Sequence, residues 1–374
     1  MAEYLTNTAE LTAVANAIRE KGGTSEQLAC PDGFVTAIQA IQTGVLLQIT
    51  VATNAGATVT ATKGNKTVSG TADTNGHCTL TVDEAGTWTV TAATASTTKT
   101  SDVVVGINNV DLSLVDSVLN NNSWATIKKV SDAGQGENYW SIGDRKAITL
   151  NGTVGKLSLS NVTTYAFIIG FNHNASVEGT NRIHFQLAKT ALSGGTDIAF
   201  CDSSYNSSVS ATGYFSMNSS NTNSGGWKSS QMRTNICGTS LSSYSGTIIA
   251  VIPAALRAVL KSVTKYTDNK GYSSDASAVT ATTDYFFLLS EYEVFGSIEY
   301  GNTNEKSKQA QYSYYSAGNR KVKYNHSKTS TAVVWWLRSP YARYSTFFVS
   351  VGTGGTVGTD NAYYSFGFAP GFCV

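Results

Sequence analysis

The sequence has few charged residues, few prolines and no long apolar run. Only 14% of the 374 residues are charged and the net charge is +1, which argues against a nucleic-acid-binding protein with a basic stripe and against a disordered, charged tail. No apolar run approaches the ~20 residues of a membrane span, so we expect no membrane insertion. Residues 1–21 lack a basic segment followed by an apolar one, and we therefore expect no secretory signal.

Motifs of common enzymes and metal sites are also missing. The five cysteines (Cys30, Cys78, Cys201, Cys237 and Cys373) are scattered and lack CxxC spacing, which favours free thiols in a chain made in the cytoplasm. The four histidines are isolated and form neither HxH nor HExxH. GxSxG is absent, and the glycines lack the spacing of a phosphate-binding loop. We expect no metal, no cofactor and no catalytic residue.

Three carboxylates remain as candidates for acid–base chemistry. Glu291 and Glu293 lie two apart in SEYEVFG, on one face if this segment is a strand, and Asp284 precedes them. A paired-carboxylate site needs that geometry together with burial. The favoured interpretation is structural: a glutamate that accepts hydrogen bonds from backbone N–H groups or from an arginine. A glycan or peptidoglycan hydrolase remains the alternative.

The residues that are present predict a β-rich α+β chain with three parts. There are 34 glycines, and 10% of the residues are aromatic, a composition typical of strands joined by many turns. Residues 1–44 form the first part, a helical segment. Leu11, Val14, Ala15 and Ile18 recur at helical spacing, Gly22 and Gly23 end this helix, and a second short helix follows from about residue 31.

Residues 45–106, the second part, alternate with a period of two. Ile49 and Val51, Leu80 and Val82, and Trp88 and Val90 stand between polar neighbours, and turn sequences such as TNG separate the runs. This predicts a small antiparallel sandwich with Trp88 in its core. The pattern resembles the immunoglobulin-like modules of phage tail proteins and bacterial surface proteins, in which such a module is a spacer.

Residues 107–374 show no further boundary and form the third part. We expect strands at 147–150, 165–171, 247–252 and 285–289, joined by long loops rich in serine, asparagine and glycine. One helix is predicted to begin at Pro253, where a missing N–H costs little. Leu256, Val259, Leu260 and Val263 form its apolar face, and Lys261 and Lys265 lie near its C-terminal end.

The C-terminus carries the most informative motifs. Trp335, Trp336, Leu337, Phe368 and Phe372 are predicted core anchors, and they flank the segment YARYSTFFVSVGTGGTVGTDNAYYS. Together with GGWKSSQMR, KYTDN, LLSEYEVFG and GNRKVKYN, this region resembles the C-type-lectin-fold domains of phage and gut-bacterial proteins. That group is related to formylglycine-generating-enzyme-like folds and includes the variable proteins of diversity-generating retroelements.

The resemblance implies a ligand-binding surface between the anchors. In 347–351 a period of two directs Phe347, Val349 and Val351 inward and Phe348, Ser350 and Gly352 outward. Tyrosine supplies contact area at low rotamer cost, whereas serine, glycine and asparagine adapt their hydrogen bonds. The candidate surface, variable in that family, comprises Tyr341, Arg343, Tyr344, Ser345, Phe348, Ser350, Gly352, Asp360, Asn361, Tyr363 and Tyr364. A fixed binding surface and a loop without a binding role are the alternatives.

The resemblance also implies a setting. Residues 1–44 resemble N-terminal pieces of phage tail proteins, so all three parts point to a virion tail or to a bacterial cell surface. The implied partners are a host-cell surface protein or glycan, other tail proteins through the N-terminus, and further copies of the chain, with a trimer as one option. The EPN, QPD and WND motifs of calcium-dependent lectins are absent, and so is a reactive cysteine pair, so neither calcium-mediated sugar binding nor oxidase chemistry is implied. A purely structural tail component is a further alternative.

Overall fold

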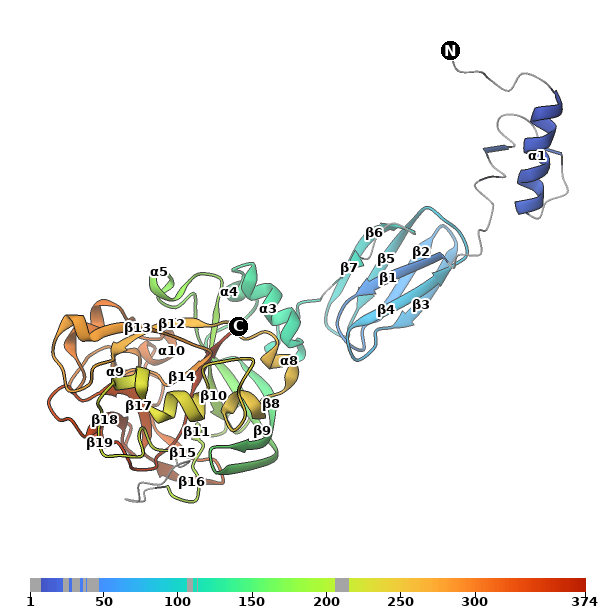
Figure 1. The fold of residues 1–374 in the computed structure, drawn as a ribbon. Helices are drawn as coiled ribbons and strands as arrows, with labels where there is room; N and C mark the ends of the chain where they lie inside the picture. The colour runs from blue at the N-terminus through green and yellow to red at the C-terminus, as the bar shows by residue number, and fades with distance from the viewer. Residues whose placement is uncertain are drawn as a thin grey trace, which may run out of the picture. The chain divides into compact units, whose positions relative to one another are not determined.

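A computed structural model describes residues 8–22, 27–28, 34–35, 38, 47–105, 110–112, 114–205 and 215–374 (Figure 1). The chain is β-rich with short helices, as the α+β prediction requires. It divides into two compact units, Met1–Ser113 and Leu114–Val374. Within the described residues, no helix is both long enough and apolar enough to cross a bilayer.

The N-terminal unit begins with a helix and continues with two sheets. Its elements are α1 (Thr8–Gly22), β1 (Leu47–Ala52), β2 (Thr58–Lys63), β3 (Lys66–Thr71), β4 (His77–Val82), β5 (Thr87–Ala93), β6 (Thr98–Val104) and β7 (Val110–Asp111). The predicted first helix is confirmed, and Ala15 and Ile18 are its buried residues. Most of the predicted second helix lies outside the described residues. The described residues of that segment, 34, 35 and 38, are helical.

The two sheets of this unit have the strand orders β4-β1-β7 and β3-β2-β5-β6. Their pairings are antiparallel except β1 with β7, which is parallel. A Cβ atom on Gly70 of β3 would lie 3.0 Å from side-chain atoms of Cys78 and Leu80 on β4, so the sheets face one another at close range. Trp88 is fully buried between them and donates its indole N–H to the Glu84 carbonyl oxygen. The period-two prediction therefore holds for β1, β2, β4 and β5, because one face of each of these strands is covered.

The C-terminal unit contains the remaining elements. Its helices are η1 (Leu119–Asn121), α3 (Trp124–Asp132), α4 (Gly136–Tyr139), α5 (Ala175–Glu178), α6 (Gly226–Ser229), the π-helix η2 (Met232–Cys237), α7 (Ile248–Val251), α8 (Ala254–Arg257), η3 (Ala276–Ala278), α9 (Glu291–Phe295), η4 (Thr303–Ser307) and α10 (Ser313–Ser316). Its strands are β8 (Arg145–Val154), β9 (Leu157–Phe171), β10 (Ile183–Lys189), β11 (Ile198–Ala199), β12 (Val263–Asp268), β13 (Val279–Asp284), β14 (Phe286–Phe287), β15 (Lys323–Asn325), β16 (Lys328–Val333), β17 (Trp335–Pro340), β18 (Phe347–Val351), β19 (Val357–Asn361) and β20 (Gly371–Cys373).

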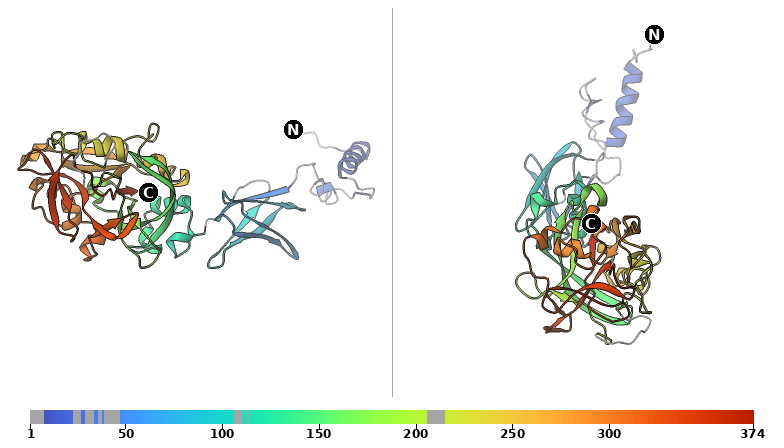
Figure 2. Two further views of the ribbon diagram at one scale, coloured as in Figure 1. Left: turned by 90° about the horizontal axis from the view of Figure 1, so that it is seen from below. Right: turned by 90° about the vertical axis from the view of Figure 1, so that its left-hand side faces the viewer.

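A five-stranded antiparallel sheet, ordered β14-β20-β10-β9-β8, has the most strands of the sheets in this unit. The C-terminal strand β20 lies inside it, and Figure 2 shows the chain end surrounded by the ribbons of the unit. Val374 and Phe372 are fully buried. The five predicted aromatic and leucine anchors of the C-terminus are likewise fully buried, so that prediction is confirmed.

Two predictions for 247–265 are wrong. Residues 248–251 form the helical turn α7 and not a strand; a short apolar run does not distinguish a buried helical turn from a buried strand. The helix after Pro253 lasts one turn, α8, and Val263 and Lys265 belong to strand β12. Burial of Val263, Lys265 and Thr267 follows a period of two because β12 pairs along its whole length with β13.

Candidate functional site

The predicted surface lies on the loops of a three-stranded sheet, β17-β18-β19. Residues 341–346 join β17 to β18, and residues 362–365 follow β19. Arg343, Tyr344 and Ser345 are exposed. The other predicted residues in partial contact with solvent are Tyr341, Gly352, Asp360, Asn361, Tyr363 and Tyr364. The backbone N–H of Ala362 donates to the carbonyl oxygen of Thr346 at 2.8 Å, so the two loops lie side by side.

Phe348 and Ser350 do not belong to this surface. They are 0% and 1% exposed, so the expectation that they point into solvent is wrong. The Ser350 hydroxyl donates to the Asp360 carboxylate at 2.8 Å, so this carboxylate already has a hydrogen-bond partner within the protein. Alternation failed because β18 is the middle strand and both of its faces are covered. Phe347, which was expected to point inward, is partly exposed.

Four aromatic side chains gather at the first loop, and we call them the aromatic surface: Tyr300, Tyr341, Tyr344 and Phe347. The ring centroids of Tyr344 and Phe347 lie 5.6 Å apart with the rings stacked, and those of Tyr341 and Tyr344 lie 5.2 Å apart. Tyr300 approaches Tyr341 edge-on at 5.3 Å. Tyr344 is 56% exposed. Sequence reasoning missed Tyr300, which lies 41 residues before Tyr341 in the chain.

Asn223 holds the backbone of this loop in place. Its side-chain nitrogen lies within hydrogen-bonding distance of three carbonyl oxygens, at 3.0 Å from Tyr341, 2.9 Å from Tyr344 and 2.9 Å from Phe347. Its backbone N–H donates to the Ser345 carbonyl oxygen at 2.7 Å. Asn223 is fully buried. The loop is therefore anchored through its backbone, and the side chains of residues 343–345 are left to face solvent.

A second aromatic group adjoins the other loop. Tyr363 and Tyr364 meet edge-on with ring centroids 5.0 Å apart, and Tyr364 also contacts Phe366. The Asn361 side-chain oxygen accepts a hydrogen bond from the Asn221 amide at 2.7 Å. Asn223 thus connects one segment to the first loop, and Asn221 connects the same segment to the end of β19, where the second loop begins.

The C-terminal unit also contains a buried ion cluster of four residues: Glu178 (α5), Lys265 (β12), Glu293 (α9) and Arg338 (β17). The Lys265 ammonium group donates to Glu178 at 2.7 Å and to Glu293 at 2.9 Å. Arg338 forms a bidentate ion pair with Glu293. All four side chains are nearly or fully buried. Three of them come from the motifs KYTDN, SEYEVFG and WWLRSP, which are far apart in sequence and meet here.

Histidines, a tyrosine and a cysteine border the cluster. His173 stacks on Tyr312 with centroids 3.7 Å apart, and the Tyr312 hydroxyl lies 2.8 Å from the Lys265 ammonium group. The Cys373 sulfur lies 3.3 Å from Nδ1 of His184. Burial, reinforced by the charge of Lys265, lowers the pKa of His173 to about 3, and burial raises the pKa of Cys373 to about 12. The imidazole and the thiol are therefore neutral at pH 7.

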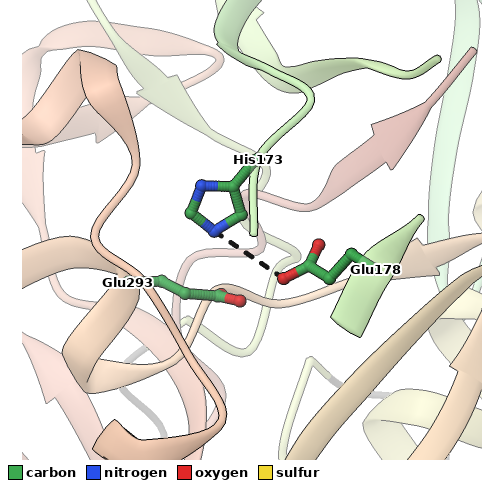
Figure 3. Close-up of side chains that lie close together, drawn as sticks. All are labelled: His173, Glu178 and Glu293. Carbon is green, nitrogen blue, oxygen red and sulfur yellow. Dashed lines mark ion pairs between the residues drawn. The ribbon is translucent and has the colours of Figure 1, made fainter. Parts of the chain in front are cut away.

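His173, Glu178 and Glu293 have the donor types of a metal site. One ligand atom of each lies within 4.8 Å of the others (Figure 3). The carboxylates, however, already bind Lys265, and both oxygens of Glu293 also accept from Arg338. A divalent cation would have to displace the Lys265 ammonium group from its two carboxylates. The arrangement accordingly fits an internal ammonium ion better than a metal.

The three carboxylates proposed for acid–base chemistry have structural partners. Glu291 accepts hydrogen bonds from the backbone N–H groups of residues 299, 300 and 301. Glu293 binds Arg338 and caps helix α9 through Ser290. Asp284 accepts from Trp227 at 3.0 Å and from Arg233 at 2.6 Å. Glu291 and Glu293 lie on a helix, not a strand, so the assumed same-face geometry is also wrong.

The thiols of the described cysteines are buried. Cys78, Cys201, Cys237 and Cys373 are free, and Cys30 lies outside the described residues. Desolvation raises the pKa of Cys201 to about 12, and it raises the pKa of Cys237 as well. These groups are poor nucleophiles because the thiolate form is suppressed.

Comparison with known proteins gives one family. Residues 206–374 match the family described as Domain of unknown function (DUF6273). The match covers less than half of the chain, and it includes the aromatic surface together with three members of the buried ion cluster, Lys265, Glu293 and Arg338. No curated protein matches the chain.

Proposed function

We propose that this chain is a non-enzymatic binding protein whose C-terminal unit presents the aromatic surface to a partner. The observation that carries this proposal is the anchoring of the 341–347 loop by Asn223 through backbone carbonyls. A loop fixed by its backbone keeps its shape when its exposed side chains change. Half-exposed tyrosines on such a loop offer contact area at low entropic cost.

The proposal extends to the resembled family. The C-terminal unit is a C-type-lectin-fold domain, and Tyr341, Arg343, Tyr344, Ser345, Asn361, Tyr363 and Tyr364 are positions diversified by a retroelement. Residues 45–106 are an immunoglobulin-like spacer, and residues 1–44 attach the protein to a phage tail or to a bacterial cell surface. The partner is a host-cell surface protein or glycan. The two facing sheets of the N-terminal unit and the solvent contact of the seven named positions support this proposal.

The test is simultaneous replacement of Tyr341, Tyr344, Tyr363 and Tyr364 by alanine. We expect loss of adsorption to host cells with little change in melting temperature, because Tyr344 is 56% exposed and the other three side chains are partly exposed. The matched control replaces Tyr139 and Tyr272, which are 38% and 57% exposed elsewhere, and should keep adsorption. A large fall in melting temperature, or full adsorption by the fourfold variant, would refute the proposal.

The encoding DNA tests the diversification separately. A neighbouring reverse-transcriptase gene and an imperfect repeat of the 3′ end that differs only at adenines would support it. Their absence would leave a fixed binding surface.

Undetectable release of sugar or peptide from host cell walls is expected, because Glu291, Glu293 and Asp284 are bound within the protein.

A further inference from the structure

A cavity of about 300 Å³ opens in the C-terminal unit, apart from the aromatic surface. Its walls include Arg145 from β8, Lys189 from β10, Asp197, Tyr314 from α10 and Arg320. This volume is at the lower end of the range for small-molecule sites. None of the residues predicted for binding from the sequence lines it.

The charges on the cavity wall are unbalanced. Lys189 pairs with Asp197 and lies 2.9 Å from the Tyr314 hydroxyl. Arg145 and Arg320 also line the cavity, and neither forms an ion pair with any residue that the structure describes. Two arginines therefore line one cavity, and the carboxylate that lines it among the described residues, Asp197, is already paired with Lys189. Guanidinium groups bind carboxylates and phosphates through paired N–H donors.

Arg145 is held in a fixed orientation. Its Nη1 donates to the carbonyl oxygens of Ala191 and Gly194, both at 2.6 Å, which engages one of the three guanidinium nitrogens. The loop that supplies these carbonyls is closed by the Thr196 N–H, which donates to the Thr190 hydroxyl at 2.8 Å. A Cβ atom on Gly195 would lie 2.7 Å from that hydroxyl, and its φ is +69°. The loop is thus built tightly around Arg145, and the guanidinium group is oriented before any ligand arrives.

A buried cation lies near the same wall. Lys323 is 1% exposed, and its ammonium group has no hydrogen-bond partner among the described residues. It lies 5.6 Å from the centroid of the Phe167 ring, and the Lys189 ammonium group lies 4.5 Å from that centroid. Burial lowers the pKa of Lys323 to about 8, and the Asp197 carboxylate favours its charged form. The ammonium form still predominates at pH 7 and adds to the positive potential of the cavity.

We propose that this cavity binds the oxyanion of a small hydroxylated ligand, an acidic sugar or a polyol phosphate, between Arg145 and Arg320. The carboxylate or phosphate oxygens accept from the two guanidinium groups. The Tyr314 hydroxyl donates to Asp197 and accepts from Lys189, so its oxygen has room for one further hydrogen bond, from a hydroxyl of the ligand. The site is separate from the aromatic surface and does not depend on the function proposed for it.

The test is calorimetric titration of the full chain with glucuronate and with glycerol 3-phosphate. Glucose and glycerol are the uncharged counterparts. We expect saturable binding of at least one anion, no binding of its counterpart, and affinity that falls as NaCl is raised. The anion that binds with the higher affinity shows whether the natural ligand is a carboxylate or a phosphate ester. Arg320→Gln and Arg145→Gln should each weaken binding about tenfold.

Two controls make the result decisive. Arg343→Gln removes an exposed arginine outside the cavity and should leave the affinity unchanged. The fourfold tyrosine variant should bind the anion normally, which separates this proposal from the function proposed above. Arg320 is exposed, so Arg320→Gln is expected to fold even if Arg145→Gln does not. Absence of saturable binding for both anions, equal affinity for an uncharged counterpart, or unchanged affinity in Arg320→Gln would overturn the proposal.

Discussion

The side-chain nitrogen of Asn223 lies 2.9 Å from the carbonyl oxygen of Tyr344, across 121 residues of sequence. The same nitrogen reaches the carbonyl oxygens of Tyr341 and Phe347. Because Asn223 binds the backbone of the loop, exposed side chains on that loop are free to vary. This division between a fixed backbone and variable side chains is what the proposed binding function requires.

Asn223→Ala should loosen the 341–347 loop. Loss of a buried donor that serves three carbonyls is expected to lower the free energy of unfolding by about 1–3 kcal/mol. Hydrogen–deuterium exchange should accelerate in residues 341–347, and urea unfolding gives the energy. Asn221→Ala, which removes the contact with Asn361, is the control that leaves this loop protected. Unchanged exchange in Asn223→Ala would contradict the anchoring role.

Truncation of Phe348 should destabilise the protein far more than truncation of Tyr344. Phe348 is fully buried, so Phe348→Ala is expected to cost about 3–5 kcal/mol of folding free energy. Tyr344 is 56% exposed, so Tyr344→Ala should stay within about 0.5 kcal/mol. Thermal or urea unfolding measures both. Similar costs for the two variants would mean that the loop residues pack as part of the core.

Glu293→Gln should be strongly destabilising. The substitution leaves Arg338 and Lys265 buried without their shared carboxylate, and breaking such a pair costs about 3–5 kcal/mol. Lys128→Gln, in the exposed pair with Asp132, is the control and should change stability by at most about 0.5 kcal/mol. A small effect of Glu293→Gln would show that the cluster is not a central stabilising element.

Removal of Lys265 should convert the cluster into a metal site. In Lys265→Ala the carboxylates of Glu178 and Glu293 lose the ammonium group that joins them, and Arg338 stays bound to Glu293. The carboxylate of Glu178 and the imidazole of His173 then lie beside Glu293 without that ammonium group. Zn²⁺ should then raise the melting temperature of this variant, because carboxylate and imidazole are zinc ligands. The wild-type protein should not respond, and Lys265→Ala combined with His173→Asn should lose the gain. Stabilisation of the wild type by Zn²⁺ would contradict the role assigned to Lys265.

Stability should fall as the pH rises from about 4.5 to about 7, partly because of Glu305. Burial raises the pKa of this carboxyl from 4.5 to about 7. Between these values the native state holds a proton that the unfolded chain has released, so raising the pH favours unfolding by roughly 3 kcal/mol. Glu305→Gln cannot titrate and should flatten this decline in urea unfolding measured at pH 5 and pH 8. If stability falls as much with pH in Glu305→Gln as in the wild type, other groups cause the decline.

Local patterns in the sequence were reliable where one face of an element is buried. The first helix and the alternating strands around Trp88 follow their predicted periods, because solvent lies on one side of each. The same reasoning failed at β18, where Phe348 and Ser350 are covered on a face expected to be open. It also failed at β12, because pairing with β13 outweighs the helical spacing of 256–263.

The sequence alone determined the β-rich class, the first helix, the alternation of the N-terminal strands and the aromatic anchors of the C-terminus, since these depend on spacing between neighbours in the chain. Only the tertiary structure decided which charged residues meet. Lys265, Glu293 and Arg338 lie far apart in sequence, and Asn223 lies more than a hundred residues from the loop that it holds. Such contacts depend on how distant strands and loops pack, and no local period encodes them.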